Sequence, residues 1–387
     1  MIRTKKKIAV SGQLEERLVF FLFILLIMGG CSSSSPSDND ILVSKDTRYL
    51  PDYDNGDTIY INVKIAIDER GWNSKTPDYF KTELTKQWQQ INARFNNSDR
   101  KKLLKRTYVF QPDVNDIIVY SGCSYWGENG ANEKVIKQMD TTFFKLGVIY
   151  DFFYEGAEAG EYGGGCGDDR GIGTILVING SEDFKNKYND HFGVYTYRAI
   201  THELGHFRGV TDLYIDVIEA ANNPLSQEKF MPDHCLMNDF CYTPDEESYW
   251  SDYAVKIINK VGNQKKAGLI NDLMYEDFAD RMLITATKNG DPIDAQVKLY
   301  PAEYDHTKWS SVIKETPLFV YSLTNGQFQV NDLRKLFFRS DNHWDRYHVF
   351  LSEATVGNEK RYLWIADYMM HESGMDEKKT YELNFNF

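Results

Sequence analysis

The sequence predicts an α+β protein in which a mixed, twisted sheet with packed helices is followed by a C-terminal β-sandwich. Up to about residue 282, expected strands alternate with helical stretches, as in a sheet covered by helices. Beyond it, short alternating segments are separated by turn signals such as Asn289-Gly290-Asp291-Pro292, which is typical of a sandwich. Hydrophobic residues at 42% and charged residues at 26% exclude global disorder. The formal charge of −13 argues against nucleic acid as the main partner.

The first thirty residues have the layout of an export leader. Basic residues near the start precede an unbroken apolar run at residues 19–28. This run is too short to span a bilayer, which needs about 20 residues, but it suits the core of a signal peptide. The following Gly29-Gly30-Cys31 resembles the lipobox of bacterial lipoproteins. The resemblance implies that residues 1–30 are removed, that residues 31–50 are a tether, and that Cys31 anchors the exported chain to the outer membrane or cell surface. A plain signal peptide or a short membrane anchor is the alternative.

Four cysteines remain for the folded part if Cys31 carries a lipid: Cys123, Cys166, Cys235 and Cys241. An even number in an exported protein suggests up to two disulfides, and four cysteines allow three pairings.

The first domain, expected at residues 51–283, begins with alternating apolar residues at 59–67, which predict a strand. Thr76 then supplies a helix N-cap and Pro77 a first helical residue. The helix is expected to run to Phe95, because apolar residues recur at spacings of three and four along one face. Further strands are expected at residues 108–110, 117–120, 147–153 and 174–178, and a helix at 133–146.

The second domain, expected at residues 284–387, is predicted to be all β. Its strands are expected at residues 282–287, 294–300, 317–321, 327–330, 348–353, 362–368 and 380–385. Residues 289–300, together with Asn325-Gly326-Gln327-Phe328, resemble the carboxypeptidase regulatory-like or transthyretin-like domains.

A candidate metal site lies at His202-Glu203-Leu204-Gly205-His206. On a helix, the two histidines are one turn apart on the same face. Both imidazoles can then approach one zinc ion at about 2.0–2.1 Å. Glu203 points about 100° around the helix from His202, beside the metal, where a carboxylate can hold a zinc-bound water as general base.

The residues that follow extend this pattern. Gly209 can adopt the positive φ that ends a helix and turns the chain, which brings Asp212 back towards the metal. His202, His206, Gly209 and Asp212 together resemble the metzincin zinc signature in its Asp-ligand form. The Asp212-Leu213-Tyr214 stretch is similar to the immune inhibitor A and IgA-metalloendopeptidase-like groups. The resemblance implies a zinc ion held by His202, His206 and Asp212.

The same resemblance extends to Cys235-Leu236-Met237-Asn238, which is similar to the Met-turn of that clan. It implies that Met237 lies under the zinc and that Cys235 and Cys241 flank the turn. In some metzincins a tyrosine two residues after this methionine assists the oxyanion, but Asp239 stands there, with Tyr242 further on, and no tyrosine is assigned that role.

The third metal ligand stays open on the residues alone, because most metzincins have a histidine at the position of Asp212. The rivals are Asp216, Glu219, His234 and Asp239. A downstream glutamate ligand would make the protein a gluzincin instead. The remaining histidines are scattered and are interpreted as structural: His191, His306, His343, His348 and His371.

The expected function is a zinc-dependent endopeptidase at the bacterial cell surface, with a protein or peptide as substrate, no nucleic-acid partner, and a monomeric state. The substrate is expected to add a strand to the sheet edge formed by residues 147–153 or 174–178. The alternative is a binding or adhesion lipoprotein, in which a protease-like domain keeps its fold without activity.

Overall fold

The computed structural model describes residues 42–43, 52–96, 104–120, 144–152, 173–178, 191–238, 248–264, 270–305, 307–308, 310–341, 343 and 345–387. The leader and Cys31 lie outside the described residues, as does most of the helix expected at 133–146. Part of the expected tether belongs to the first sheet, because β1 (Leu42–Val43) pairs with β5 (Ile118–Tyr120). No helix in the described part of the chain is long and apolar enough to cross a membrane.

The first sheet is built around β3 (Thr58–Asp68), whose neighbours run mostly parallel to it. The order is β1, β5, β3, β6 (Leu146–Asp151), β7 (Gly173–Ile178). Along its length β3 also pairs with β4 (Thr107–Pro112) in parallel and with β2 (Tyr53–Asp54) in antiparallel direction. All the strands expected in this domain are present, within one or two residues of their predicted ends.

Both faces of β3 are buried, as is usual for a central strand among parallel neighbours. Alternate residues from Ile59 to Ile67 enter the main hydrophobic core. On the other face, Lys64 is buried and its ammonium group lies 3.1 Å from carboxylate oxygens of both Asp113 and Asp116. These two ion pairs compensate the positive charge of Lys64, which the alternation of side chains along β3 places inside the protein.

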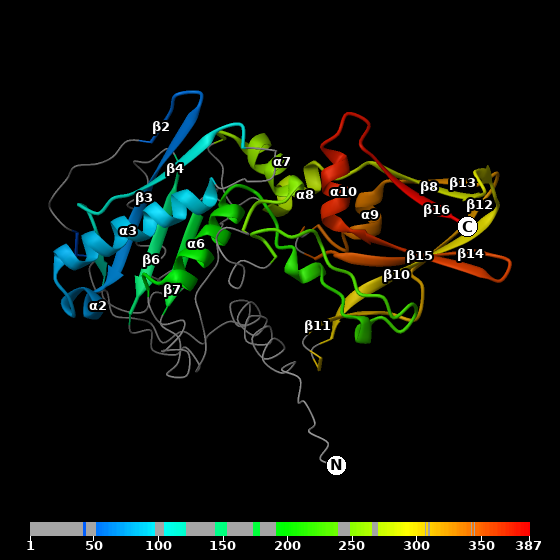
Figure 1. The fold of residues 1–387 in the computed structure, drawn as a ribbon, viewed down its shortest axis with the longest axis horizontal. Helices are drawn as coiled ribbons and strands as arrows, with labels where there is room; N and C mark the ends of the chain where they lie inside the picture. The colour runs from blue at the N-terminus through cyan, green and yellow to red at the C-terminus, as the bar shows by residue number, and fades with distance from the viewer. Residues whose placement is uncertain are drawn as a thin grey trace, which may run out of the picture.

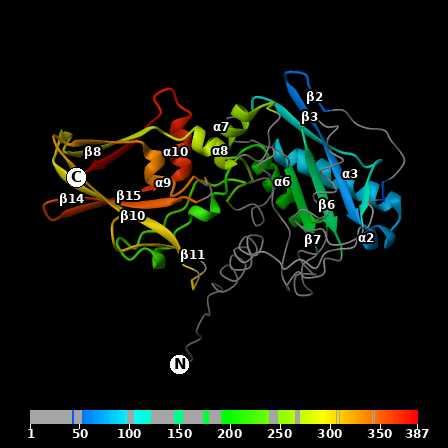
Figure 2. The same cartoon turned by 180° about the vertical axis from the view of Figure 1, so that it is seen from behind.

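Helices α3 (Pro77–Phe95) and α6 (Val194–Phe207) lie side by side over one face of this sheet (Figures 1 and 2). The expected cap is present, since the backbone N–H of Tyr79 donates to Thr76 Oγ1 at 3.2 Å. The apolar face of α3 is buried as expected, and Gln87 on the same helix accepts a 2.7 Å hydrogen bond from Tyr150 on β6. The shorter helices of this half are α2 (Glu69–Asn73), α7 (Asp252–Val261) and α8 (Ile270–Glu276).

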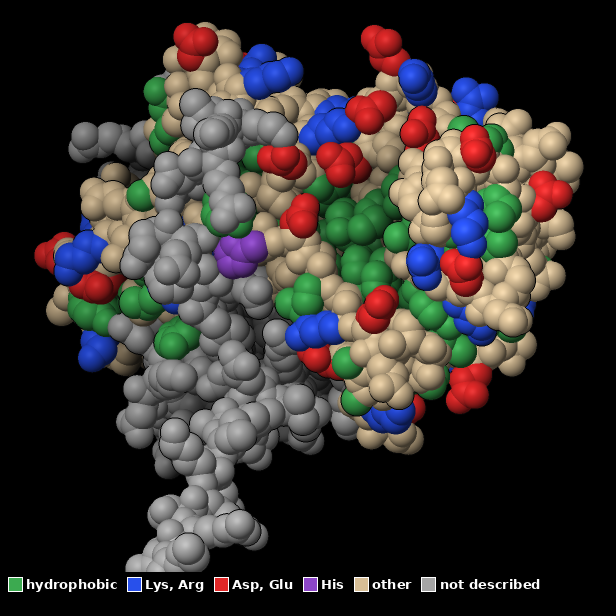
Figure 3. Space-filling model, turned by 45° about the vertical axis from the view of Figure 1, so that its right-hand side comes forward, with side chains coloured by type: hydrophobic (Ala, Val, Ile, Leu, Met, Phe, Trp, Pro, Cys, Tyr) green, Lys and Arg blue, Asp and Glu red, His purple; other side chains and the backbone are tan. Residues whose placement is uncertain are grey.

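The C-terminal part consists of two packed sheets, which confirms the expected α+β class. One sheet has the order β11 (Ser310–Ile313), β10 (Ala295–Asp305), β14 (Val349–Val356), β15 (Glu359–Ala366), and β12 (Phe319–Leu323) also pairs with β10. The other has the order β13 (Gln327–Asn331), β8 (Arg281–Lys288), β16 (Thr380–Asn386), with β9 (Asp291–Pro292) beside β8. Side chains from both sheets share a second hydrophobic core. On the face shown in Figure 3, acidic and basic side chains are interspersed over this half.

Details of the second half differ from expectation. Strand β8 begins at Arg281, so it runs across the boundary expected after residue 283. The strand expected at 362–368 ends at Ala366, because Asp367 begins helix α10 (Asp367–Gly374). The sequence patterns predicted neither β11 nor the short helix α9 (Leu333–Phe337). The Asn-Gly turns were read correctly, since Asn325 and Gly326 both have positive φ, at 52° and 72°.

The segment that leaves α6 lies against the sandwich. In Figure 1 it runs from the end of α6 towards β11. Phe230 stacks on Trp364 of β15 with ring centroids 5.3 Å apart, and the Asn222 side-chain amide donates to Ser310 Oγ at 2.8 Å. The second domain therefore helps to fix the loop that carries Asp212.

Candidate metal centre

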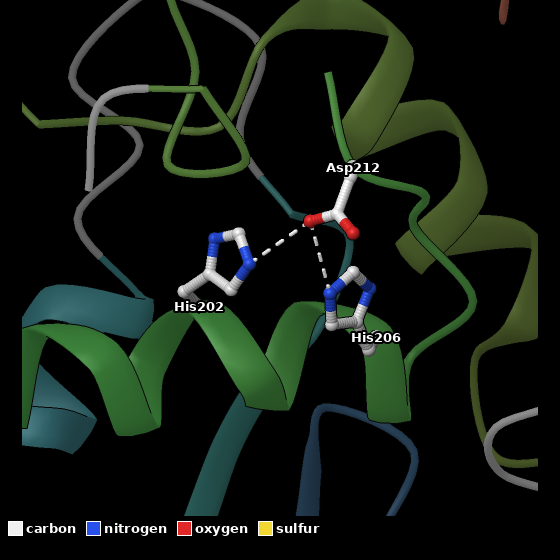
Figure 4. Close-up of side chains that lie close together, drawn as sticks. All are labelled: His202, His206 and Asp212. Atoms are coloured by element: carbon white, nitrogen blue, oxygen red, sulfur yellow. Dashed lines mark ion pairs between the residues drawn. The ribbon is translucent and has the colours of Figure 1, made fainter. Parts of the chain in front are cut away.

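Helix α6 presents both histidines of the motif from one face. His202 and His206 are one turn apart, with ring centroids 4.9 Å from each other. The opposite face is in the core, where Ile200, Leu204 and Phe207 are buried. This burial orients the helix so that the two imidazoles point away from the sheet, towards the loop that follows (Figure 4).

Asp212 comes back to these imidazoles through the predicted turn. Gly209 ends the helix with φ +89°, and its N–H donates to the His206 carbonyl at 2.8 Å. Asp212 Oδ1 then lies 3.1 Å from His202 Nε2 and 3.2 Å from His206 Nε2 (Figure 4). Donors around a tetrahedral zinc, at bonds of about 2.0–2.2 Å, stand about 3.3 Å apart. The distances from Asp212 Oδ1 to the two Nε2 atoms are therefore close to those between ligand atoms that share one metal ion.

The far side of each imidazole is held by a backbone carbonyl. His202 Nδ1 lies 3.0 Å from the Leu236 carbonyl, and His206 Nδ1 lies 2.8 Å from the Val210 carbonyl. A carbonyl only accepts, so each Nδ1 carries the proton and donates it. In a neutral ring this leaves the lone pair on Nε2, facing the common point, which is the arrangement typical of metal-ligating histidines.

The electrostatics where these three ligand atoms converge favour a bound cation. Two imidazole nitrogens and a carboxylate oxygen converge, all of them able to accept. Without a metal, a proton must take that place. Burial by itself would lower the pKa of His206. The charge and hydrogen bond of Asp212 outweigh this effect and raise the pKa to about 9. Burial likewise raises the pKa of Asp212, and the two imidazoles outweigh this and hold it well below its usual range.

Glu203 stands beside this centre with one carboxylate oxygen that no described residue satisfies. It is buried, and its Oε2 has no hydrogen bond to any described residue. Its negative charge contributes to the raised pKa of His206, which places it in the field of the same site. A buried carboxylate oxygen without a partner is costly unless a water or ligand fills the place. A water held by this oxygen would satisfy it, as the role of a general base requires.

Met237 packs against helix α6 at Gly205. It is fully buried, and its sulfur stands only 2.6 Å from where a side chain at Gly205 would begin. Its carbonyl accepts the N–H of Leu213 at 3.0 Å, next to Asp212. The absence of a side chain at Gly205 thus lets the segment of Met237 contact both the helix and the loop that carries Asp212.

The rival third ligands that the structure describes do not join the two histidines. Glu219 pairs with Lys229 at 3.0 Å, and the ring of His234 packs against Tyr249. Asp216 belongs to a different group, and Asp239 lies outside the described residues. Within the described chain, no downstream glutamate joins His202 and His206, so the gluzincin alternative gains no ligand there.

The histidines interpreted as structural include one exception. His191 stacks on Phe152, His343 stacks on Tyr275, and His371 Nδ1 lies 3.0 Å from the Tyr253 hydroxyl. His348, in contrast, forms a second group of potential metal ligands with Asp216 and Asp367. Sequence reasoning missed this group because Asp216 lies about 130 and 150 residues before His348 and Asp367, with no local spacing to connect them. His306 lies outside the described residues.

Two further expectations concern the surroundings of the site. Cys235 is a free, buried thiol, so two disulfides among the four cysteines are not both formed in this structure. Cys123, Cys166 and Cys241 lie outside the described residues, and a disulfide among them stays a prediction. Of the two strands expected to bind substrate, β6 is paired on both sides, by β3 and β7, and is not an edge. Among the described strands, β7 has β6 as its partner and ends the sheet.

The sequence matches no protein-family model. It also matches no curated protein. Among solved structures, the chain is similar to wild-type OgpA from Akkermansia muciniphila, with 11% sequence identity and a TM-score of 0.35, covering 84% of this chain and 97% of that one. At this identity and TM-score, the similarity supports no conclusion on fold family or function.

Proposed function

We propose that this protein is a zinc-dependent endopeptidase of the metzincin type, with His202, His206 and Asp212 as metal ligands and Glu203 as general base. The observation that carries the proposal is the convergence of the three ligand atoms, each imidazole being held by a backbone carbonyl on its other nitrogen. Two imidazoles and one carboxylate are a usual ligand set for catalytic zinc, which keeps a fourth position for water or substrate.

The bound zinc would supply Lewis acidity to the scissile carbonyl and lower the pKa of the attacking water. The remaining work belongs to the chain's own residues. Glu203 Oε2 accepts the proton of that water and returns it to the leaving amine. Its burial keeps competing solvent away from this oxygen, and its place on the ligand helix fixes it relative to the metal.

The substrate in this proposal is an extended peptide that pairs with the open side of β7. This strand precedes α6 in the chain and packs on it, so an added peptide strand would run beside the metal ligands. The leader and lipobox motif further support a location at the bacterial cell surface, with Cys31 as the anchor, and we expect a monomer there.

The test is metal-dependent cleavage of a complex peptide library by the chain without its leader, read by mass spectrometry. We expect cleavage that a zinc chelator abolishes and added zinc restores, because the reaction needs the metal at this site. His202→Ala should also abolish it, whereas His343→Ala, which changes a histidine of the second half that stacks on Tyr275, should not. A folded, zinc-loaded protein that cleaves nothing would instead support the binding or adhesion alternative.

A further inference from the structure

A second group of converging ligand atoms lies between the two halves of the protein. Asp216 belongs to the 3₁₀ turn η2 (Tyr214–Asp216) just after Asp212, whereas His348 precedes β14 and Asp367 begins α10. One ligand atom from each of Asp216, His348 and Asp367 can be chosen so that all lie within 4.8 Å of one another. The group thus joins the loop of the first site to the sandwich.

The carboxylate of Asp216 is the unusual member. It is fully buried, and neither of its oxygens has a hydrogen-bond partner among the described residues. Its Oδ1 faces His348 Nδ1 at 3.8 Å. An ionised carboxylate taken out of water without a partner is strongly unfavourable, so this side chain needs a positive charge or a proton.

The second carboxylate is only half satisfied. Asp367 Oδ2 accepts from Arg346 Nε at 2.6 Å and lies 2.9 Å from His348 Nδ1, but its Oδ1 is buried and has no partner among the described residues. The positive charge of one guanidinium, that of Arg346, thus faces the charges of two buried carboxylates, those of Asp216 and Asp367. Burial and the charge of Asp367 accordingly raise the pKa of Asp216 well above its usual value.

We propose that Asp216, His348 and Asp367 bind a divalent transition-metal ion of the zinc class, separate from the ion at His202. Two donors that share such an ion stand at most about 4.2 Å apart when each bond is about 2.1 Å. His348 Nδ1 lies within that limit of both carboxylates, at 3.8 Å and 2.9 Å, and the ligand atoms of the two carboxylates lie within 4.8 Å of each other. The imidazole donor favours this class over calcium, which takes oxygen ligands. His348, with 31% of its side chain exposed, gives the ion a route from solvent.

The role of this ion would be to fasten the loop of Asp212 to the sandwich. Asp216 lies four residues after Asp212, and both other ligands belong to the second half. The proposal does not rest on the function of the first site, because the two groups share no residue.

The experiment isolates this site in the full chain without its leader, using a His202→Ala/His206→Ala background that lacks the first ligands. Zinc content is measured by mass spectrometry after dialysis, and thermal unfolding is followed with and without zinc. The background protein should retain one zinc per chain, and saturating zinc should raise its melting temperature by about 3 °C or more. Asp216→Asn, and independently His348→Gln, should abolish both effects.

The control is Asp277→Asn, which changes another aspartate near a histidine, 3.9 Å from His371, outside this group. It should keep the bound zinc. Without zinc, Asp216→Asn should melt no lower than its parent, because it removes a buried charge. A folded background protein that binds no zinc, binds calcium instead, or keeps its zinc after Asp216→Asn would overturn the proposal. If wild type loses zinc through Asp216→Asn but not through His202→Ala/His206→Ala, the second site stands and the first fails.

Discussion

Replacing Glu203 with glutamine should reduce kcat for peptide cleavage by about 10²- to 10⁴-fold, the usual contribution of a positioned general base. The amide has the same shape but does not accept the proton of the attacking water at neutral pH. Because Glu203 is not one of the three converging ligands, the zinc content should stay unchanged. Steady-state kinetics on a cleaved peptide from the library, together with metal analysis, measure both quantities.

Glu219→Gln is the matched control for this variant. Glu219 lies in the segment that follows α6, has 42% of its side chain exposed, and pairs with Lys229 at 3.0 Å. Its replacement should change kcat by less than about twofold, because exposed ion pairs contribute little. Equal activity of Glu203→Gln and the wild type would exclude Glu203 as the base and, with it, the proposed mechanism.

Replacing Arg346 with alanine should lower the free energy of unfolding by about 3–5 kcal/mol. The Arg346 side chain is 2% exposed, its partner Asp367 is 1% exposed, and the two are joined at 2.6 Å. The variant leaves Asp367 buried, next to the Asp216 carboxylate, without its guanidinium. It also removes the Arg346 donation to the His343 carbonyl at 3.0 Å. Denaturant unfolding of metal-free protein gives the value directly.

The pair of Lys335 and Asp332 provides the comparison. Its atoms are also 2.6 Å apart, but the side chains are 84% and 47% exposed. Lys335→Ala should therefore leave the free energy of unfolding nearly unchanged, since water screens the charge in both the folded and the unfolded state. If Arg346→Ala were as mild as Lys335→Ala, the loss of the buried guanidinium beside Asp367 would not carry the cost that its burial indicates.

Local patterns predicted most of the fold. The cap at Thr76, the apolar face of α3, the Asn-Gly turn at Asn325 and the positive φ of Gly209 each follow from a few neighbouring residues, and all are present. What failed depends on contacts between distant segments. The sequence does not show that β6 is paired on both sides, nor that the strand ending at Ala366 gives way to a helix there.

The same division holds for the two candidate metal groups. His202, His206, Gly209 and Asp212 lie within eleven residues, so helix periodicity and one turn suffice to bring the ligands together. The group of Asp216, His348 and Asp367 exists only because the sandwich packs against the loop after α6, through contacts such as that of Phe230 with Trp364. Tertiary packing of this kind leaves no spacing signal in the sequence.

The most direct test of the proposed zinc site is X-ray diffraction from crystals of the zinc-loaded protein, recorded at wavelengths on both sides of the zinc absorption edge. An anomalous peak is expected within about 2.0–2.2 Å of His202 Nε2, His206 Nε2 and an oxygen of Asp212, with Glu203 facing a water on that ion. A fully zinc-loaded crystal with no peak at these three side chains would show that they do not bind zinc.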